Sequence, residues 1–157
     1  HVLKVHPMTT LPPSRQIRKP GHWSGAYDCV TLNYDDRFLR RKMLSTVRAE
    51  QFLVDLAHTT SLDHGDAFAL EDGRLIEVVA AKEDLLEVTG DDLPRIAWHI
   101  GNRPTPCQIE EGRLLIQRDH VIRDMLGKIG ATVREVVEPF TPEGGAYGHG
   151  RTHGHSH

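Results

Sequence analysis

The sequence predicts an α+β protein in three parts: an N-terminal small β-domain, a ferredoxin-like βαββαβ domain and a disordered His-rich tail. Short apolar runs separated by turn residues fill the first half of the chain. In the second half, two amphipathic segments alternate with apolar runs in the order β-α-β-β-α-β. The last nine residues hold four histidines among small and polar residues, a composition that cannot form a core.

Length and composition limit the class of protein. The 157 residues suffice for one ordinary domain or two small ones, and 38% hydrophobic with 26% charged residues is typical of soluble globular proteins. A net charge of −3 argues against general nucleic-acid binding. We expect no membrane span and no secretory signal, because no apolar run is long enough. Cys29 and Cys107 form no close pair, which favours free thiols in a reducing cytoplasm.

The first 82 residues divide into a lead-in and a β-domain. Residues 1–26 are rich in Pro, Arg and Gly without a sustained period, which predicts a loosely ordered lead-in. Residues 27–82 predict a β-rich domain, although residues 38–44 mix apolar and basic side chains ambiguously. Its clearest short apolar runs are residues 29–34, 51–56, 67–70 and 75–81.

Residues 83–138 predict the ferredoxin-like domain. Its first helix follows an N-cap at Asp91 or Asp92 and ends at Gly101, and its second follows an N-cap at Asp119. The predicted strands are residues 84–89, 107–110, 113–117 and 132–137. The helix positions expected to face the core are Leu93, Ile96, Ala97, Ile100, Val121, Ile122, Met125, Leu126 and Ile129.

The tail, residues 139–157, is rich in Pro, Gly and His and is predicted to be flexible. Imidazole is the commonest side-chain ligand for nickel, copper and zinc. We therefore interpret the tract as a metal-binding tail. The alternatives are an expression tag or a chance cluster, although a tag is usually an unbroken run of histidines. The four tail histidines are His149, His153, His155 and His157.

Two further histidines are candidate metal ligands. His99 lies about 60° from Ile96 around the first predicted helix, so it borders the apolar stripe. The alternative for His99 is a half-buried packing role. His120 falls in the first turn of the second helix, where the helix dipole disfavours a cation and leaves the imidazole neutral with a free lone pair. The alternative for His120 is a solvated surface residue.

Enzymatic activity has little support in the sequence. The motifs of phosphate-binding loops, zinc proteases and serine hydrolases do not occur. Cys107 with a histidine would make a nucleophile and base, but no local signature accompanies it. Most carboxylates lie at turns and helix starts, where capping accounts for them. We expect a protein that is not an enzyme.

Several segments in a fixed order resemble the UreE-type urease accessory proteins. These segments are YDDRFLRRK at 34–42, FLVDL at 52–56, HIGNR at 99–103, RDHVIRDML at 118–126 and PFTPEGGAY at 139–147. The resemblance implies a nickel metallochaperone with a β-rich peptide-binding domain and a ferredoxin-like metal-binding domain. It also implies a homodimer joined through the second domain. The family delivers nickel to apo-urease together with other accessory proteins, including a GTPase.

The chain departs from the family's pattern at one important position. The family usually places a nickel-binding histidine directly after Gly-Asn-Arg, where two subunits meet. This chain has Pro104 there, and proline offers no side-chain lone pair. The resemblance places additional ligands of some members at His99 and His120, whereas another such position is Arg118 here. The tail is therefore expected to hold a larger share of the metal.

These observations predict a carrier of Ni(II) as cargo. Cu(II) and Zn(II) are expected to bind the same imidazoles, because the affinity order does not single out nickel. Binding is expected to weaken as the pH falls through about 6, near the pKa of histidine. Two alternatives stay open. One is a nickel storage or buffering protein that needs no transfer partner, and the other is a protein-assembly chaperone whose metal binding is incidental.

Overall fold

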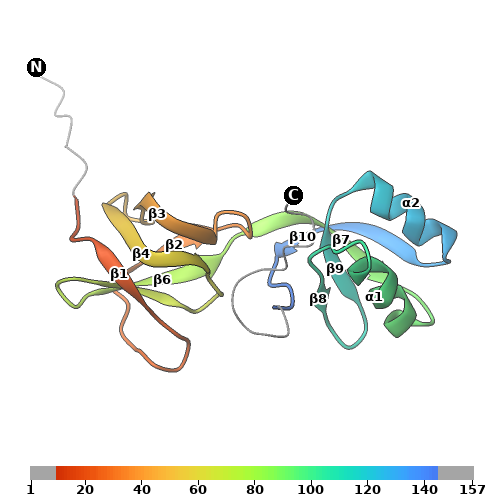
Figure 1. Cartoon of the computed structure of the whole chain (residues 1–157), viewed down its shortest axis with the longest axis horizontal. Coiled ribbons are helices and arrows are strands. Elements are labelled where there is room, and N and C mark those ends of the chain that lie inside the picture. The colour runs from red at the N-terminus through yellow and green to blue at the C-terminus, as the bar shows by residue number, and fades with distance from the viewer. Residues whose placement is uncertain (1–9, 145–157) are drawn as a thin grey trace, which may run out of the picture. The chain divides into compact units, whose positions relative to one another are not determined.

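The computed structural model describes residues 10–144, which divide into two units at the bond between Val79 and Ala80. The first unit contains a six-stranded sheet with the order β2-β6-β5-β1-β4-β3. Strand β1 pairs in parallel with β4 and antiparallel with β5. Figure 1 shows the strands of this unit and labels all of them except β5. They are β1 (Ser14–Arg18), β2 (Asp28–Leu32), β3 (Phe38–Ser45), β4 (Gln51–Ser61), β5 (Ala67–Leu70) and β6 (Leu75–Ala80).

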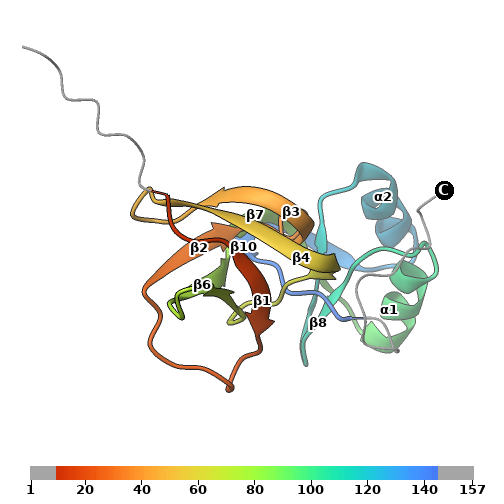
Figure 2. The same cartoon turned by 60° about the vertical axis from the view of Figure 1, so that its left-hand side comes forward.

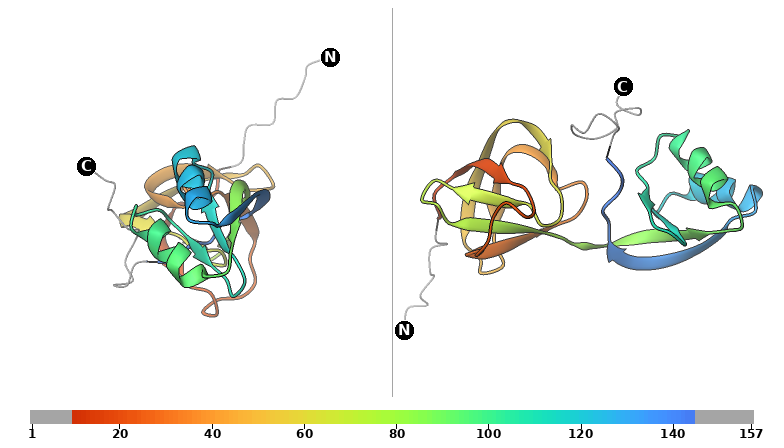
Figure 3. Two further views of the ribbon diagram at one scale, coloured as in Figure 1. Left: turned by 90° about the vertical axis from the view of Figure 1, so that its right-hand side faces the viewer. Right: turned by 90° about the horizontal axis from the view of Figure 1, so that it is seen from below.

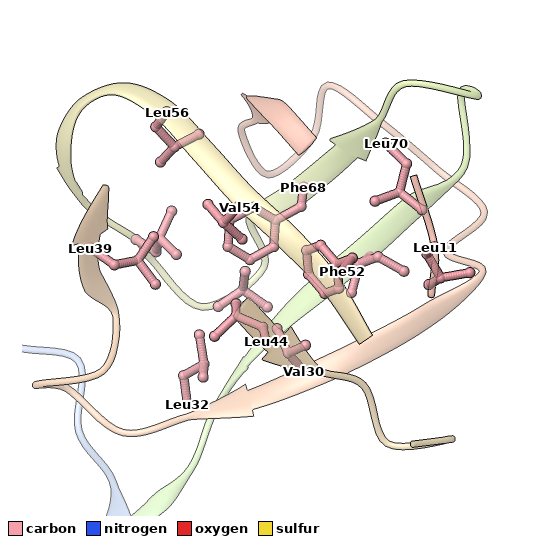
Figure 4. Packing of buried hydrophobic residues seen from close by; sticks show 13 residues of the cluster. Leu11, Val30, Leu32, Leu39, Leu44, Phe52, Val54, Leu56, Phe68 and Leu70 are labelled. Atoms are coloured by element: carbon pink, nitrogen blue, oxygen red, sulfur yellow. The ribbon is translucent and has the colours of Figure 1, made fainter. Parts of the chain in front are cut away.

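Alternation along the strands builds the core of the first unit, which Figure 4 shows from close by. In β4, Phe52, Val54 and Leu56 point inward and are almost fully buried. The ring of Phe52 meets that of Phe68 edge-on, with the centroids 5.5 Å apart. The predicted apolar runs are thus confirmed as strands of one sheet.

The ambiguous residues 38–44 form strand β3, and a register shift explains their mixed pattern. The pairing with β4 shifts between Leu39 and Arg41, so the strand does not keep a strict period of two. Leu39 and Leu44 are buried, while the four residues between them are exposed. The basic run therefore lies on the surface without interrupting the sheet.

The prediction of a loosely ordered lead-in over residues 1–26 is wrong for residues 14–18. These residues form β1, which lies between β5 and β4 inside the sheet. Only one of the five residues, Ile17, is apolar, so the strand has no hydrophobic period. Pairing of its backbone on both sides holds it in place.

The second unit contains a four-stranded antiparallel sheet and two helices. The sheet order is β10-β7-β9-β8. Both helices pack on one face of the sheet, as Figure 3 shows, against a core that includes Leu86, Val88 and Ile116. The elements are β7 (Lys82–Thr89), α1 (Leu93–Gly101), β8 (Gln108–Ile109), β9 (Leu114–Gln117), α2 (His120–Lys128) and β10 (Thr132–Pro139).

The helix caps follow the prediction. The Asp92 side chain accepts a hydrogen bond from the Arg95 backbone, and the Asp119 side chain accepts from Val121 and Ile122. Two positions predicted to face inward do not: Val121 is 46% exposed and Ile129 is 38% exposed. Val121 lies in the first turn beside the cap, and Ile129 is the C-cap beyond the last turn, so neither reaches the sheet.

The prediction that flexibility begins at residue 139 is also wrong. Pro139 ends β10, and Phe140 is fully buried. Composition alone misses this segment because a single aromatic residue anchors it. Residues 145–157, including the four tail histidines, lie outside the described part of the chain. Among residues 10–144, no helix is long and apolar enough to span a membrane.

Candidate metal centre

His99 lies in the last turn of α1 and is half-buried. Its imidazole meets the Trp98 ring edge-on, with the centroids 5.1 Å apart and the planes at 86°. Trp98 itself is 63% exposed. The buried side of the same helix is formed by Ile96 and Ile100. His99 therefore borders the packed stripe, as the helical period predicted, beside an exposed aromatic residue.

Pro104 follows α1 in the chain that leads to β8. The Asn102 backbone donates to the Trp98 carbonyl and the Arg103 backbone to that of Ile100, which closes the helix before Pro104. Pro104 is half-buried and offers a metal only its backbone carbonyl. The position where the resemblance expects a central ligand thus contributes no side-chain donor.

Cys107 is the nearest thiol along the chain, and it is poorly suited to replace the missing ligand. The side chain is half-buried and free of any disulfide. Burial, followed by the charge of Glu143, raises the pKa of the thiol to about 11. Because the thiolate is the metal-binding form, a free Cys107 is almost wholly in the form that does not bind at neutral pH.

His120 is the first residue of α2 and is exposed. It lines a shallow surface hollow together with Arg118, Arg123 and Glu135. Arg118 is committed to the fold: its guanidinium donates to the carbonyls of Leu85 and Val136 at 3.1 Å each. Arg118, which stands where the resemblance places a histidine in some family members, therefore links β7 to β10 in this chain.

The segment after β10 is fixed to the hairpin of β8 and β9. The Thr141 backbone donates to the Gln108 side chain at 2.9 Å, and the Glu143 backbone donates to the Cys107 carbonyl at 2.9 Å. This second contact places Glu143 beside Cys107, which lies three residues after Pro104 in the sequence. Six extended residues span roughly 20 Å, so His149 starts within that distance of the Glu143 anchor.

Charged contacts reinforce this anchor. The guanidinium of Arg113 pairs with Glu138 at 2.7 Å, with Glu110 at 2.9 Å and with Glu87 at 3.0 Å. Its hydrogen bonds hold the pKa of Glu87 and Glu138 below their usual range. Sequence reasoning missed Gln108 and Arg113, since both follow a pattern common to any polar hairpin. Phe140 was the one signal that could have revealed the anchor.

Within residues 10–144, no three His, Cys, Asp or Glu side chains gather in a way that could hold a metal ion. His99 and His120 are thus the only two of the six predicted ligands that the structure describes, and they form no such group in this range. A described histidine would need ligands from the tail or from a second copy to complete a metal site.

The two units match the two domains of one protein family. Residues 8–81 match the N-terminal domain of the UreE urease accessory protein, and residues 83–157 match its C-terminal domain. The chain belongs to the UreE family. This is a family of accessory chaperones and not of enzymes.

Named relatives extend over almost the whole chain. A urease accessory protein UreE of Ruegeria pomeroyi is 80% identical over 94% of this chain and 99% of its own length. That of Cereibacter sphaeroides is 62% identical over 96% of this chain and 82% of its own. That of Rhodobacter capsulatus is 55% identical over 96% of both chains.

Proposed function

We propose that this chain is a nickel metallochaperone that delivers Ni(II) to apo-urease while its metal centre is assembled. The main support is that the chain is 80% identical, along nearly its full length, to a protein named as a urease accessory protein. Apo-urease and the other accessory proteins, including a GTPase, are the proposed partners. The proposed form is a cytoplasmic homodimer joined through the second unit, which we take to be a ferredoxin-like domain because its sheet order is β10-β7-β9-β8.

The proposed cargo site combines tail histidines with His99 and His120. Support comes from the anchoring of residues 141 and 143 beside Cys107, which starts the tail close to the α1–β8 chain. Ordering a tail around a metal costs about 1–2 kcal/mol per residue fixed. Such a site binds less tightly than a rigid one with the same ligands, which suits a carrier that must release its metal.

Equilibrium dialysis with nickel tests the cargo site. Replacing His149, His153, His155 and His157 by alanine should sharply reduce the nickel bound per chain, and His99→Ala with His120→Ala should reduce it further. His58→Ala is the matched control, because His58 is an exposed histidine on β4 of the other unit. Unchanged stoichiometry in the tail variant would remove the tail from the proposal.

Nickel storage is the second candidate, because the same tail histidines would also hold nickel in a protein that has no transfer partner. A storage protein and a carrier would give the same dialysis result. Release separates them: a carrier gives up nickel faster when apo-urease and its accessory proteins are added, whereas a store releases it at the same rate. A pure assembly factor would support urease activation at limiting nickel even without the six histidines that are candidate ligands.

A further inference from the structure

A groove crosses the outer face of the sheet in the first unit. Gln16 pairs with Ala69, and Ala69 pairs with Leu75, so these three side chains lie in a row on one face. The row forms a mainly apolar floor between β1, β5 and β6. The walls and rim are formed by Trp23, His22, Arg15, Arg18 and Glu71.

The wall that carries Trp23 is held in place before any ligand binds. It belongs to the long loop between β1 and β2 that Figure 2 shows. Lys19 ties this loop to the buried carboxylate of Asp66 at 2.9 Å, and the Trp23 indole donates to the Gly65 carbonyl at 3.0 Å. Gly65 has a φ of +89°, which favours glycine, and the Pro20 ring packs beside it, 3.4 Å from where a Cβ would lie. Because this wall is already ordered, binding of a ligand in the groove costs little conformational entropy of the protein.

The rim carries more positive than negative charge. Arg15 pairs with Glu71, and Arg41 pairs with Asp55 at 2.9 Å, which is also 3.9 Å from Arg15. Arg18 donates to the amide oxygen of Gln16 at 3.0 Å and has no carboxylate partner within residues 10–144. Arg15 and Arg41 are each more than half exposed. Arg40 also lies 3.9 Å from Asp55, so four guanidinium groups on and beside the rim face two carboxylates on an open surface.

We propose that this groove docks an extended acidic peptide segment of a partner protein, with apolar side chains on the floor and carboxylates on Arg15 and Arg18. Strand β1 pairs with β5 along Gln16–Arg18 and meets β4 at Ser14, so it lies inside the sheet and recognition uses the face that carries the groove. The apolar floor and the rim carboxylate of Glu71 disfavour a nucleic acid, whose phosphates would meet that carboxylate. The chain's own ends do not fit, since residues 1–9 and 145–157 contain no Asp or Glu.

The proposal gives a surface and a ligand class to the peptide-binding role that the family resemblance implies for this domain. It does not rest on the nickel role, and its test contains no metal. Trp98→Phe in the full chain leaves Trp23 as the one tryptophan, whose fluorescence then reports on the groove. The probe is a blocked heptapeptide of alternating Glu and Val, compared with one in which Lys replaces Glu. We expect saturable binding of the Glu peptide that weakens with salt, and no binding of the Lys peptide.

Charge variants locate the site. Arg15→Gln with Arg18→Gln should weaken binding by up to about fivefold per arginine, the upper end for an exposed ion pair. Glu71→Gln should strengthen binding, because it removes the carboxylate that competes for Arg15. Arg48→Gln is the matched control, since it removes an arginine of the same unit that does not line the groove.

Several results would overturn the proposal. They are absence of peptide binding, equal binding of the Lys peptide, an unchanged affinity in the double variant, or weaker binding in Glu71→Gln. An equal fluorescence change with a single-stranded oligonucleotide would show that the groove binds polyanions in general and not acidic peptides in particular. If the double variant is too unstable to measure, two experiments on the parent chain still test the proposal. These are the salt dependence of Glu-peptide binding and the comparison with the Lys peptide.

Discussion

Arginines have opposite roles in the two units. In the second unit, Arg113 is surrounded by Glu87, Glu110 and Glu138, and its side chain is only 25% exposed. In the first unit, Arg15 is 55% exposed and shares its carboxylates, while Arg18 contacts an amide. An arginine saturated with carboxylates holds strands together, whereas one that is under-neutralised and exposed is available to a ligand.

The largest expected effect is a loss of stability at residues 140–143, the anchor that follows β10 near Arg113. Phe140 is fully buried, so Phe140→Ala should destabilise the second unit by about 3–5 kcal/mol. Hydrogen exchange should show faster exchange of the Thr141 and Glu143 amides, which the anchor protects. Met43→Ala, an exposed change on β3, is the control and should shift stability by no more than about 0.5 kcal/mol. A stable Phe140→Ala protein with unchanged exchange would contradict the anchor.

Replacing Arg113 should have a smaller effect. Arg113→Met leaves Glu110 and Glu138 without their cation and Glu87 with Arg134 alone, and we expect a loss of about 1–2 kcal/mol at pH 7 by urea denaturation. The cluster is partly exposed, which keeps the loss below that of a fully buried pair. An equal loss in Arg15→Gln would erase the contrast between the two clusters.

The same cluster sets a pH dependence. Hydrogen bonds from Arg113 lower the folded-state pKa of Glu87 and Glu138, so their contribution to stability is complete above the unfolded pKa of about 4.3. It is lost as the pH falls through the lower, folded pKa. As the pH falls below about 5, the parent protein should therefore lose more stability than Arg113→Met. Parallel curves would show that the carboxylates do not depend on Arg113.

The smallest expected effect on stability is at the groove. Arg15→Gln with Arg18→Gln should change the free energy of unfolding by less than about 1 kcal/mol, because exposed pairs contribute little. Peptide binding, in contrast, should fall strongly in the same protein. A large loss of stability would show that these arginines hold the sheet together as Arg113 does.

Local signals account for most of what the sequence predicted about the fold. Asp92 and Asp119 cap the helices as expected, because a cap depends on residues within one turn. Strand β1 escaped prediction because backbone pairing with β4 and β5, which are distant in sequence, holds it. Phe140 escaped because one buried side chain leaves no period.

The site was less accessible to prediction. His99 and His120 could be placed on their helices from the period, but not relative to each other. The surroundings of Cys107, which raise its pKa to about 11, arise from burial and from Glu143 far along the chain. The groove beside Trp23 depends on a loop held by Lys19 and Asp66, whose contact spans 47 residues. None of these relations has a signature in the linear sequence.

Nickel transfer tests the central claim most directly. The full chain is loaded with nickel, freed of excess metal and added to apo-urease with its accessory proteins, and urease activity is measured against a chain in which all four tail histidines are alanine. If the tail carries the nickel, the loaded parent chain activates urease and the tail variant, treated identically, activates it only weakly. Equal activation by both chains would contradict this role of the tail.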